Sequence, residues 1–374
     1  MKILAPGSTI GVMGSGQLGR MFTQVAVKQG YNVICYSPDK KSPAAKSGAV
    51  DFTGNYTNLK KLESFLKQVD AITFEFENIP DKALDFIKKF SHKNKIPVSP
   101  DPEAIKISQK RNLEKSFFRS IGLQTADFLF FPGKKDLKKR MDEIVYPCIL
   151  KTNSLGYDGK GQFKLLSRND LKKIINKLPD VEFITEQIVG FSCEISVIAA
   201  GFQNKSQVIF PPSENIHKNG ILDITIHPAR ISDTTSEKAV AAAKLLLEKL
   251  NYVGVLGLEL FVVNNEIMVN EFAPRPHNSG HYSQDAANFS QFELQLKTLT
   301  NHPIQSEIKT IPAIMKNILG DDMKRELNLS SSRLLNSNFH LHLYGKDKVK
   351  KGRKMGHWNY TGWDGKSDPL LVFR

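Results

Sequence analysis

The chain has 374 residues, 40% hydrophobic and 24% charged, and its 52 Lys and Arg against 38 Asp and Glu give a net charge of +14. This composition is that of an ordinary globular protein of two or three domains, and no stretch approaches the ~20 apolar residues of a membrane span. Pro6 and Gly7 interrupt the N-terminal segment too early for a signal peptide, so we expect a cytoplasmic protein. The charge favours anionic partners without choosing among nucleic acid, phosphorylated metabolites and a basic surface.

The first hundred residues alternate strand-like and helix-like segments, which predicts a parallel sheet wound with helices. We expect strands at residues 9–13, 32–36 and 71–76, and helices after Gly19 and over residues 81–90. Prolines cluster from Pro97 to Pro102, and this punctuation marks the first domain boundary, at 102/103.

The next segment, residues 103–303, is mixed. A polar helix is expected from Glu103 through Phe118, followed by strands at 147–151, 183–186 and 194–200. A further helix is expected over 236–250, with Thr235 or Ser236 as its N-cap. Residues 304–374 read as short strands with basic loops, a small β-rich third domain.

The three cysteines, Cys35, Cys148 and Cys193, are odd in number, widely separated and without a CxxC pair. They support neither a disulfide framework nor a cysteine metal site, so each is interpreted as a small buried apolar residue.

A first glycine-rich loop, Gly14-Ser15-Gly16-Gln17-Leu18-Gly19, follows the first strand and opens a helix. Glycines there allow close backbone approach, and the helix N-terminus attracts phosphate. Asp39 lies twenty residues beyond Gly19, so a nicotinamide dehydrogenase is one hypothesis. The alternative is a loop that packs helix on strand or binds another phosphorylated ligand.

A second glycine-rich loop runs from Lys151 to Gln162. A lysine that ends a strand, three glycines and Lys160 can surround a polyphosphate with N–H groups and positive charge. The spacing is not that of the GxxxxGK[ST] P-loop, and a plain hairpin turn is the alternative.

The segment from Leu258 to Glu271 has two apolar runs around a polar three-residue turn, which predicts a hairpin. Folding it about Asn265 pairs Val263 with Ile267 and places Glu259 opposite Glu271. Opposed buried carboxylates cost several kcal/mol without compensation, and a divalent cation resolves the conflict. Mg²⁺ takes one or two carboxylates plus phosphate oxygens and waters, so the hairpin resembles half of a metal-nucleotide site. The alternatives are carboxylates that face solvent or pair with arginines.

Two further polar segments are candidates for substrate recognition. Residues 272–281 form a dense polar turn in which His277 and His281 have the i, i+4 spacing of zinc ligands, but no HExxH glutamate accompanies them, so substrate recognition is the better interpretation. Near the C-terminus, residues 346–354 carry six Lys and Arg in nine positions, either a solvated loop or a phosphate clamp.

Five motifs in this order carry a resemblance to a known family: residues 14–20 (GSGQLGR), 75–80 (EFENIP), 156–162 (GYDGKGQ), 270–281 (NEFAPRPHNSGH) and 352–357 (GRKMGH). Over nearly the whole chain the sequence resembles the N5-carboxyaminoimidazole ribonucleotide synthetases, the PurK family of ATP-grasp ligases. The chain departs from the family pattern where Asn153-Ser154-Leu155 replaces the commoner Arg-Thr-Gly.

The resemblance implies an ATP-grasp fold, α/β and α+β, with a Rossmann-like parallel-sheet domain at 1–102, an ATP-grasp domain at 103–303 and a small β-rich domain at 304–374. It implies a carbon–nitrogen ligase of purine biosynthesis that uses ATP and bicarbonate to carboxylate 5-aminoimidazole ribonucleotide, giving ADP and phosphate through carboxyphosphate. The implied metal is Mg²⁺, with Mn²⁺ as an alternative. The implied assembly is a homodimer, with no nucleic-acid or membrane partner.

The resemblance also implies roles for individual residues. The implied ATP contacts are Lys106, Lys151, Gly156, Tyr157, Asp158, Gly159, Lys160, Gly161, Gln162, Glu186, Gln187, Ile188, Val189, Glu194, His217, Asn270 and Glu271. The implied ribonucleotide contacts are Glu75, Tyr157, Asp158, Arg275, His277, Asn278, Lys346 and Arg353. Arg275 and Lys151 are the implied catalytic residues. Glu259 and Glu271 are the implied metal ligands, in agreement with the hairpin argument.

Three rival functions remain. A nicotinamide dehydrogenase leaves the acidic hairpin and the second loop unexplained. Another ATP-grasp ligase, such as a formate-using glycinamide ribonucleotide transformylase, is disfavoured by the motifs at 14–20 and 270–281. A nucleic-acid binder is suggested by charge alone, and no motif supplies its aromatic platforms.

Overall fold

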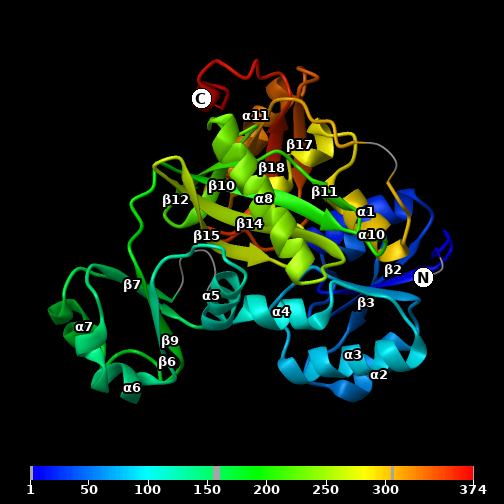
Figure 1. Ribbon diagram of the computed structural model, residues 1–374. Coiled ribbons are helices and arrows are strands. Elements are labelled where there is room, and N and C mark those ends of the chain that lie inside the picture. The colour runs from blue at the N-terminus through cyan, green and yellow to red at the C-terminus, as the bar shows by residue number, and fades with distance from the viewer. Residues whose placement is uncertain (1–2, 155–160, 305–306, 374) are drawn as a thin grey trace.

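The computed structural model describes residues 3–154, 161–304 and 307–373, and it is built on three sheets (Figure 1). A five-stranded sheet comes from the N-terminal segment, a four-stranded sheet forms the lobe at the lower left of Figure 1, and a nine-stranded sheet lies between and above them. Within the described ranges, no helix has the length and apolar character needed to cross a membrane.

The N-terminal sheet is entirely parallel, in the order β3-β2-β1-β4-β5, as the alternating pattern predicts. Its central strands are apolar on both faces because helices cover both. The bounds of its elements are β1 Thr9–Met13, α1 Gln17–Lys28, β2 Asn32–Ser37, β3 Val50–Thr53, α2 Leu59–Leu66, β4 Ala71–Phe74, α3 Asp81–Asn94 and β5 Val98–Ser99.

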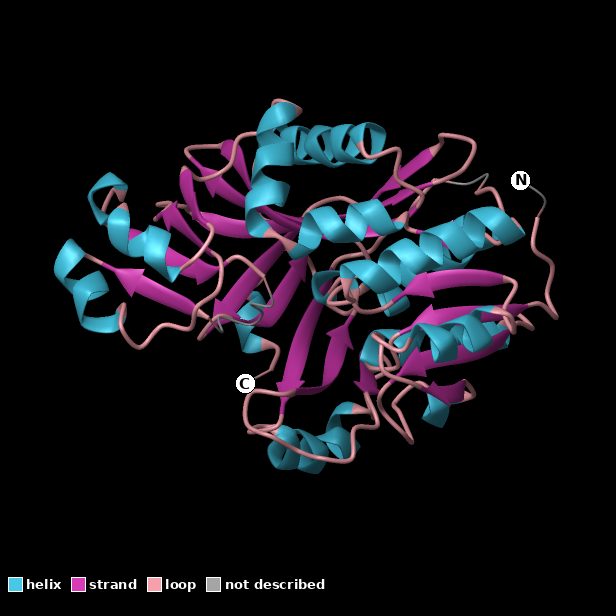
Figure 2. Ribbon diagram, turned by 90° about the horizontal axis from the view of Figure 1, so that it is seen from below, coloured by secondary structure: helices cyan, strands magenta, loops and turns pink. Residues whose placement is uncertain are grey.

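One face of this sheet is covered by a helix from far along the chain. Helix α10 (Gln291–Thr300) packs Phe292, Leu296 and Leu299 into the same core as Met21 and Phe22 of α1. Helices α2 and α3 cover the opposite face with Leu62, Phe65, Leu84 and Ile87. The ribbon in Figure 2 shows how helices and strands are layered in the molecule. The end of the expected second domain therefore completes the core of the first, although the divisions at 102/103 and 303/304 stay predictions.

The single helix expected from Glu103 to Phe118 is two helices, α4 (Pro102–Gln109) and α5 (Arg111–Ser120). The chain turns at Lys110, whose φ of −120° and ψ of 108° are extended. Polar residues on both sides of this position hide the break from periodicity, so the prediction of one helix is wrong.

The four-stranded sheet is antiparallel, in the order β6-β9-β7-β8, and α6 and α7 pack on it. Its core includes Phe131, Leu150, Leu165 and Phe183. The bounds are β6 Phe128–Phe131, α6 Lys134–Lys139, β7 Cys148–Thr152, β8 Gln162–Leu165, α7 Arg168–Ile174 and β9 Phe183–Gln187.

The nine-stranded sheet runs β15-β14-β10-β12-β13-β16-β18-β17, with β11 beside β10, and its pairs are antiparallel. The expected C-terminal strands belong to this sheet because β16 pairs with β13, so they form no separate sheet. The bounds are β10 Cys193–Gly201, β11 Gln207–Ile209, β12 Ser213–Lys218, β13 Ile221–His227, β14 Gly254–Val263, β15 Glu266–Ala273, β16 Ala313–Leu319, β17 Phe339–Leu343 and β18 Lys354–Tyr360.

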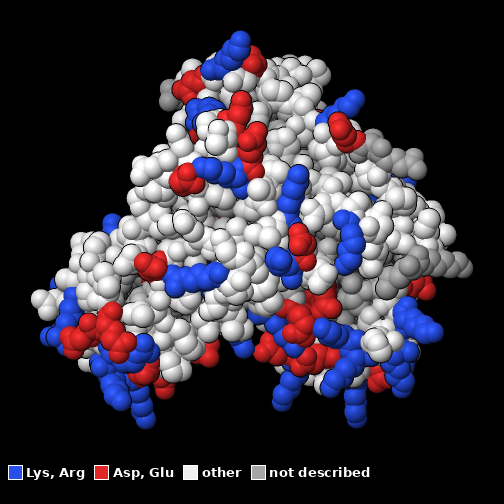
Figure 3. Space-filling model, in the orientation of Figure 1, with Lys and Arg blue, Asp and Glu red and all other residues white. Residues whose placement is uncertain are grey.

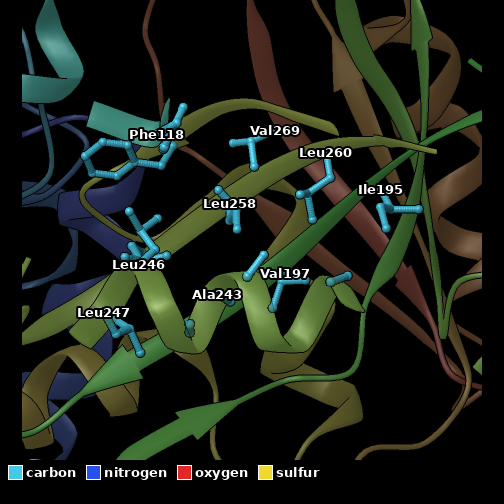
Figure 4. Packing of buried hydrophobic residues seen from close by; sticks show 14 of the residues in the cluster. Phe118, Ile195, Val197, Ala243, Leu246, Leu247, Leu258, Leu260 and Val269 are labelled. Carbon is cyan, nitrogen blue, oxygen red and sulfur yellow. The ribbon is translucent and has the colours of Figure 1, made fainter. Parts of the chain in front are cut away.

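Helix α8 (Asp233–Lys249) lies across β10 and β14, and Ala243, Leu246 and Leu247 meet Val197 and Leu258 there (Figure 4). Its N-cap is Ser232, which accepts from the N–H of Thr235, so the predicted caps were three or four residues late. The remaining helices are α9 Ser283–Ala286, α11 Met323–Arg333, which the sequence did not predict, and 3₁₀ turns at Ala45–Ser47, Met141–Glu143, Asn278–Gly280 and Pro369–Leu371.

The cysteines are all free thiols. Cys35 and Cys148 are buried as expected, whereas Cys193 at the start of β10 is half-buried against the α8 core.

Candidate active site

A pocket opens where the three sheets meet. Its wall includes Glu77 after β4, Arg111 at the start of α5, Asn153 after β7, Glu271 on β15 and Arg275 beyond it. These residues come from four separate parts of the chain, so only the fold brings them together.

At the four-stranded sheet, Lys151 and Glu186 form a buried ion pair. Lys151 Nζ lies 2.8 Å from Glu186 Oε2, and Lys115 Nζ of α5 lies 3.3 Å from the same oxygen. Burial alone would raise the pKa of Glu186, but Lys151 and Lys115 lower it to about 2, so the carboxylate is ionised at neutral pH. Glu186 Oε1 is buried and has no hydrogen-bond partner among the described residues, so it could accept a hydrogen bond from a bound ligand.

The rest of the expected adenine-side segment follows directly. Gln187 ends β9, and Ile188 and Val189 lie on the connection from the four-stranded sheet to β10. Gln187 and Ile188 are exposed, so their surface is accessible to a ligand.

The described ends of the second glycine-rich loop belong to the antiparallel pair β7 and β8. The N–H of Thr152 donates to the carbonyl of Gly161 at 3.0 Å, and Gln162 begins β8. The expected ATP residues Gly156, Tyr157, Asp158, Gly159 and Lys160 lie outside the described residues, including Tyr157 and Asp158 in their second role as ribonucleotide contacts.

The acidic hairpin forms, but with a different register from the one predicted. Asn264 and Asn265, both at positive φ, make a two-residue turn, so Val263 pairs with Glu266 instead of Ile267. An irregularity after Glu259, opposite Asn270, shifts the ladder by one residue and restores the pair Glu259–Glu271. The predicted turn and inner pairs are wrong, and the predicted opposition of the two carboxylates is confirmed.

Each of these carboxylates has a cationic or polar partner in the structure. Arg111 Nη1 lies 3.0 Å from Glu271 Oε2, and His277 Nε2 lies 2.9 Å from Glu259 Oε1. Burial would raise the pKa of Glu259, but the neighbouring His277, His217 and Lys354 lower it to about 2. The alternative in which a hairpin carboxylate pairs with an arginine is therefore observed for Glu271, whose partner is Arg111.

The donor set fits magnesium chemistry. Two carboxylates face each other across the hairpin, and the Glu271 side chain is 40% exposed towards the pocket. In the described part of the chain, no three His, Cys, Asp or Glu side chains form a metal site of their own. Phosphate oxygens and water would have to complete the coordination, as is usual for Mg²⁺.

His217 on β12 and Glu194 on β10 form the next pair, with Nδ1 2.9 Å from Oε2. Burial would lower the pKa of His217, but Glu194 raises it. Lys354, at the start of β18, adds positive charge beside both His217 and Glu259, a neighbour that the sequence did not predict.

Arg275 and His277 are fixed by residues from distant elements. Arg275 Nη2 donates to Glu77 Oε1 at 2.8 Å, and its Nε bonds the other carboxylate oxygen. His277 Nδ1 lies 2.8 Å from the hydroxyl of Ser279. A Cβ on Gly257 of β14 would lie 2.4 Å from the Cβ of His277, so only glycine allows this approach. Asn278 has a buried Nδ2 that lacks a hydrogen-bond partner in the described structure, which leaves a donor for a ligand.

Glu75 occupies the first glycine-rich loop. Its carboxylate accepts from the N–H groups of Gly16 at 2.8 Å and Gly19 at 3.0 Å, the groups that would hold a dinucleotide phosphate. Burial raises the pKa of Glu75. The dinucleotide interpretation of this loop is not supported, because a side chain of the protein already fills the anion position.

The basic segment 346–354 spans the loop between β17 and β18 and the first residue of β18, and residues of the N-terminal segment contact it. Lys46 bonds the carboxylate of Asp347 and donates to the carbonyl of Gly345 at 2.7 Å. Lys346 Nζ donates to the carbonyl of Lys354, and Arg353 Nη1 to that of Lys348. On the face shown in Figure 3, Lys and Arg gather on the two lower lobes, interspersed with Asp and Glu, and form no continuous basic stripe.

Lys106 is not among the residues that line the pocket. Its ammonium group bonds Asp85 of α3 and Glu103, so it faces the N-terminal domain. Arg111, five residues later, sits between the hairpin and Glu186 instead, and Lys115 contacts the carbonyl of Asn270 at 3.3 Å. The sequence pattern pointed to neither residue, because a single helix over 103–118 conceals the new helix start at Arg111, after the extended Lys110.

Comparison with known proteins identifies the family. Residues 7–109 match the ribonucleotide synthetase preATP-grasp domain, 116–292 the ATP-grasp domain, and 313–367 the phosphoribosylaminoimidazole carboxylase C-terminal domain. The chain is similar to N5-carboxyaminoimidazole ribonucleotide synthases of Brucella melitensis (40% identity, 95% of this chain and 96% of that one) and Bacillus subtilis (38%, 95% and 92%).

Solved structures agree. The N5-carboxyaminoimidazole synthetase of Staphylococcus aureus complexed with ADP is 35% identical with a TM-score of 0.88, over 97% of this chain and 95% of that one. The Aspergillus clavatus synthase in complex with ADP and 5-aminoimidazole ribonucleotide is 29% identical with a TM-score of 0.83, over 95% and 93%. The chain therefore belongs to the N5-carboxyaminoimidazole ribonucleotide synthase family of ATP-grasp enzymes.

Proposed function

We propose that this chain is a carbon–nitrogen ligase of purine biosynthesis that uses ATP and bicarbonate to convert 5-aminoimidazole ribonucleotide to its N5-carboxylated product, with release of ADP and phosphate. The observation that carries the proposal is one pocket lined both by Arg111 and Glu271, on the nucleotide side, and by Arg275 and His277, on the ribonucleotide side. A reaction that passes an activated carboxyl group from ATP to an amine needs both substrates in one enclosed space.

In the first step a bicarbonate oxygen attacks the γ-phosphorus, the bond from this phosphorus to the bridging oxygen breaks, and ADP leaves with that oxygen. Carboxyphosphate results. Lys151, held in place by Glu186, offers its ammonium charge to the phosphoryl oxygens, where negative charge accumulates. The remaining expected ATP contacts act as binding groups.

In the second step the exocyclic amine of the ribonucleotide attacks the carboxyl carbon, the carbon–oxygen bond to phosphate breaks, and the amine loses a proton. Arg275 is the candidate to hold the carboxyl group, because Glu77 fixes the plane of its guanidinium. Lys346 and Arg353 are the candidates for the ribonucleotide phosphate, with Glu75, His277 and Asn278 nearer its ring.

Glu259 and Glu271 would hold Mg²⁺, or Mn²⁺ in its place, and the cation would neutralise phosphate charge on ATP. The support is their opposition across the hairpin. For this to happen Arg111 and His277 must release the carboxylates, and the arriving phosphates offer Arg111 an alternative anionic partner.

The direct test measures ADP release and incorporation of isotope-labelled bicarbonate on addition of Mg-ATP and 5-aminoimidazole ribonucleotide. We expect both signals to depend on all three substrates. ADP release with formate and glycinamide ribonucleotide instead would identify another ATP-grasp ligase, and a nicotinamide absorbance change without ADP release would overturn the proposal.

Family resemblance further supports a cytoplasmic homodimer with no nucleic-acid or membrane partner. Light scattering after gel filtration should give twice the 42.0 kDa chain mass. A gel shift with unrelated duplex at two salt concentrations should detect no complex, and affinity that falls steeply with salt would contradict that expectation.

A further inference from the structure

Asn153 lies at the junction between β7 and the second glycine-rich loop, and it is completely buried. Its N–H donates to the carbonyl of Glu182 at 2.9 Å, and its carbonyl accepts from the N–H of Arg111 at 3.0 Å. Its side chain accepts from the N–H of Asn112 at 2.9 Å and donates to the side chains of Asn112 at 2.8 Å and Glu182 at 2.9 Å. One side chain thus ties together three segments.

Two of these contacts cap α5. The first N–H groups of any helix have no partner within the helix, and the residue before α5, Lys110, provides no side-chain cap. Asn153 supplies the missing acceptors from another element, its carbonyl for Arg111 and its Oδ1 for Asn112. Asn153, at the base of the glycine-rich loop, therefore stabilises the N-terminus of α5.

The capped turn carries a charged group of the site. Arg111 reaches Glu271 on β15, and one turn later Lys115 reaches Glu186. Asn153 itself lines the same pocket. A shift of the first turn of α5 would move Arg111 away from Glu271.

We propose that Asn153 is a positioning residue for the nucleotide: by capping α5 from the base of the glycine-rich loop, it fixes Arg111 at the phosphate side of the pocket. The inference rests on the proposed function for the identity of the ligand. It gives a role to Asn153, the first of the three residues at which the chain departs from the commoner Arg-Thr-Gly, because its neutral amide joins the base of the loop to α5.

A purely structural role would lower the stability of the fold and leave the affinity of the folded protein for nucleotide intact. A positioning role acts on affinity for ADP and on the KM for ATP, with the KM for the ribonucleotide unchanged. If Asn153 acts by positioning Arg111, the effects of the two alanine substitutions on ADP affinity should not add, and a double-mutant cycle measures this non-additivity.

The experiment measures the Kd of Mg-ADP by calorimetry for the wild type, Asn153→Ala, Arg111→Ala and the double variant, at a temperature where all are folded. We expect Asn153→Ala to weaken ADP about tenfold, typical of one lost buried hydrogen-bonded contact. In the Arg111→Ala background the same change should add less than about twofold. Asn153→Asp keeps the oxygen that caps Asn112 but sets a buried carboxylate oxygen against Glu182 Oε2, so it should weaken ADP at least as much as Asn153→Ala.

Asn169→Ala, an exposed asparagine in the first turn of α7, is the matched control and should bind ADP like the wild type. Normal ADP affinity in Asn153→Ala, or full additivity with Arg111→Ala, would overturn the inference. If Asn153→Ala does not fold, Asn112→Ala takes its place in the cycle: it keeps the capped backbone N–H but removes the side-chain oxygen that holds Asn153 Nδ2, so it should weaken ADP in the same direction by a smaller factor. A wild type that binds Mg-ADP but does not release ADP from the three substrates would refute the proposed function and leave this test intact.

Discussion

The Glu75 carboxylate lies 2.8 Å from the N–H of Gly16, at the N-terminus of α1, where a dinucleotide-binding protein would hold a phosphate. The two residues are 59 positions apart, so the contact exists only in the folded chain. It explains how a GxGxxG loop can follow a strand and open a helix without serving a nicotinamide cofactor: the helix dipole and the free N–H groups already have an anion.

This contact predicts a cost for Gly14→Ala. Gly14 has a φ of +108°, and an added Cβ would lie 2.5 Å from the Cγ of Glu75. Strain and clash together should lower the free energy of unfolding by about 3 kcal/mol, measured by urea denaturation. Gly122→Ala is the matched control, because Gly122 has a φ of +83° with no atom within 4 Å, and it should cost only about 1 kcal/mol. If both variants lost the same free energy of unfolding, the Glu75 side chain would move aside at little cost and the clash would contribute nothing.

Arg111 and Lys106 should differ in nucleotide binding. Arg111→Ala removes the cation beside Glu271 and should raise the Kd of Mg-ADP at least about tenfold, in line with the loss of a charged hydrogen bond. Lys106→Ala removes a pair with Asp85 and Glu103 and should change the Kd less than about twofold. Calorimetric titration measures both Kd values. A larger loss of affinity in Lys106→Ala than in Arg111→Ala would favour Lys106 as the ATP contact that the family resemblance implies.

Glu271→Ala should abolish Mg-ATP turnover and leave the fold largely intact. The Glu271 side chain is 40% exposed, so its removal leaves no buried cavity, whereas the expected metal ligand is lost. Steady-state ADP release and a thermal unfolding curve make the measurement. Glu266→Ala, on the same strand and paired with Lys238, is the control and should keep normal turnover. Near-normal activity of Glu271→Ala would remove the argument for a metal at the hairpin.

Glu186→Gln should destabilise the protein by about 3 kcal/mol at neutral pH, because Lys151 and Lys115 would keep buried charges without their counterion. The pKa of Glu186 is about 2 in the folded protein, below the ordinary value of about 4.3 for an unfolded chain. Its contribution is therefore fully present above pH ~4.3 and is lost as the pH falls towards 2. Urea denaturation from pH 6 to pH 3 should show the gap between wild type and variant narrowing, and a constant gap would contradict the assignment.

Local patterns in the sequence predicted the parallel class of the N-terminal sheet with its strands β1, β2 and β4, the strands β7, β9 and β10, and the acidic hairpin. They could do so because the period of apolar residues and the turn chemistry act over a few neighbouring residues. The turn of the hairpin differs from the predicted one: Asn264 and Asn265 have positive φ and form a two-residue turn, which shifts the register by one residue. An irregularity after Glu259 shifts it back, so the two carboxylates are paired. The opposition of Glu259 and Glu271 survived because both changes were by one residue.

The tertiary structure alone decided what joins distant segments. Glu75 in the glycine loop, Glu77 on Arg275, Arg111 on Glu271, α10 on the N-terminal sheet and β16 beside β13 are contacts that no local period encodes. Their energy comes from satisfying buried charges and burying apolar faces, and it depends on which surfaces meet once the sheets have formed. The net charge of +14 remains mostly a surface property, while Lys115, Lys151 and Arg275 are buried or half-buried and have carboxylates as partners.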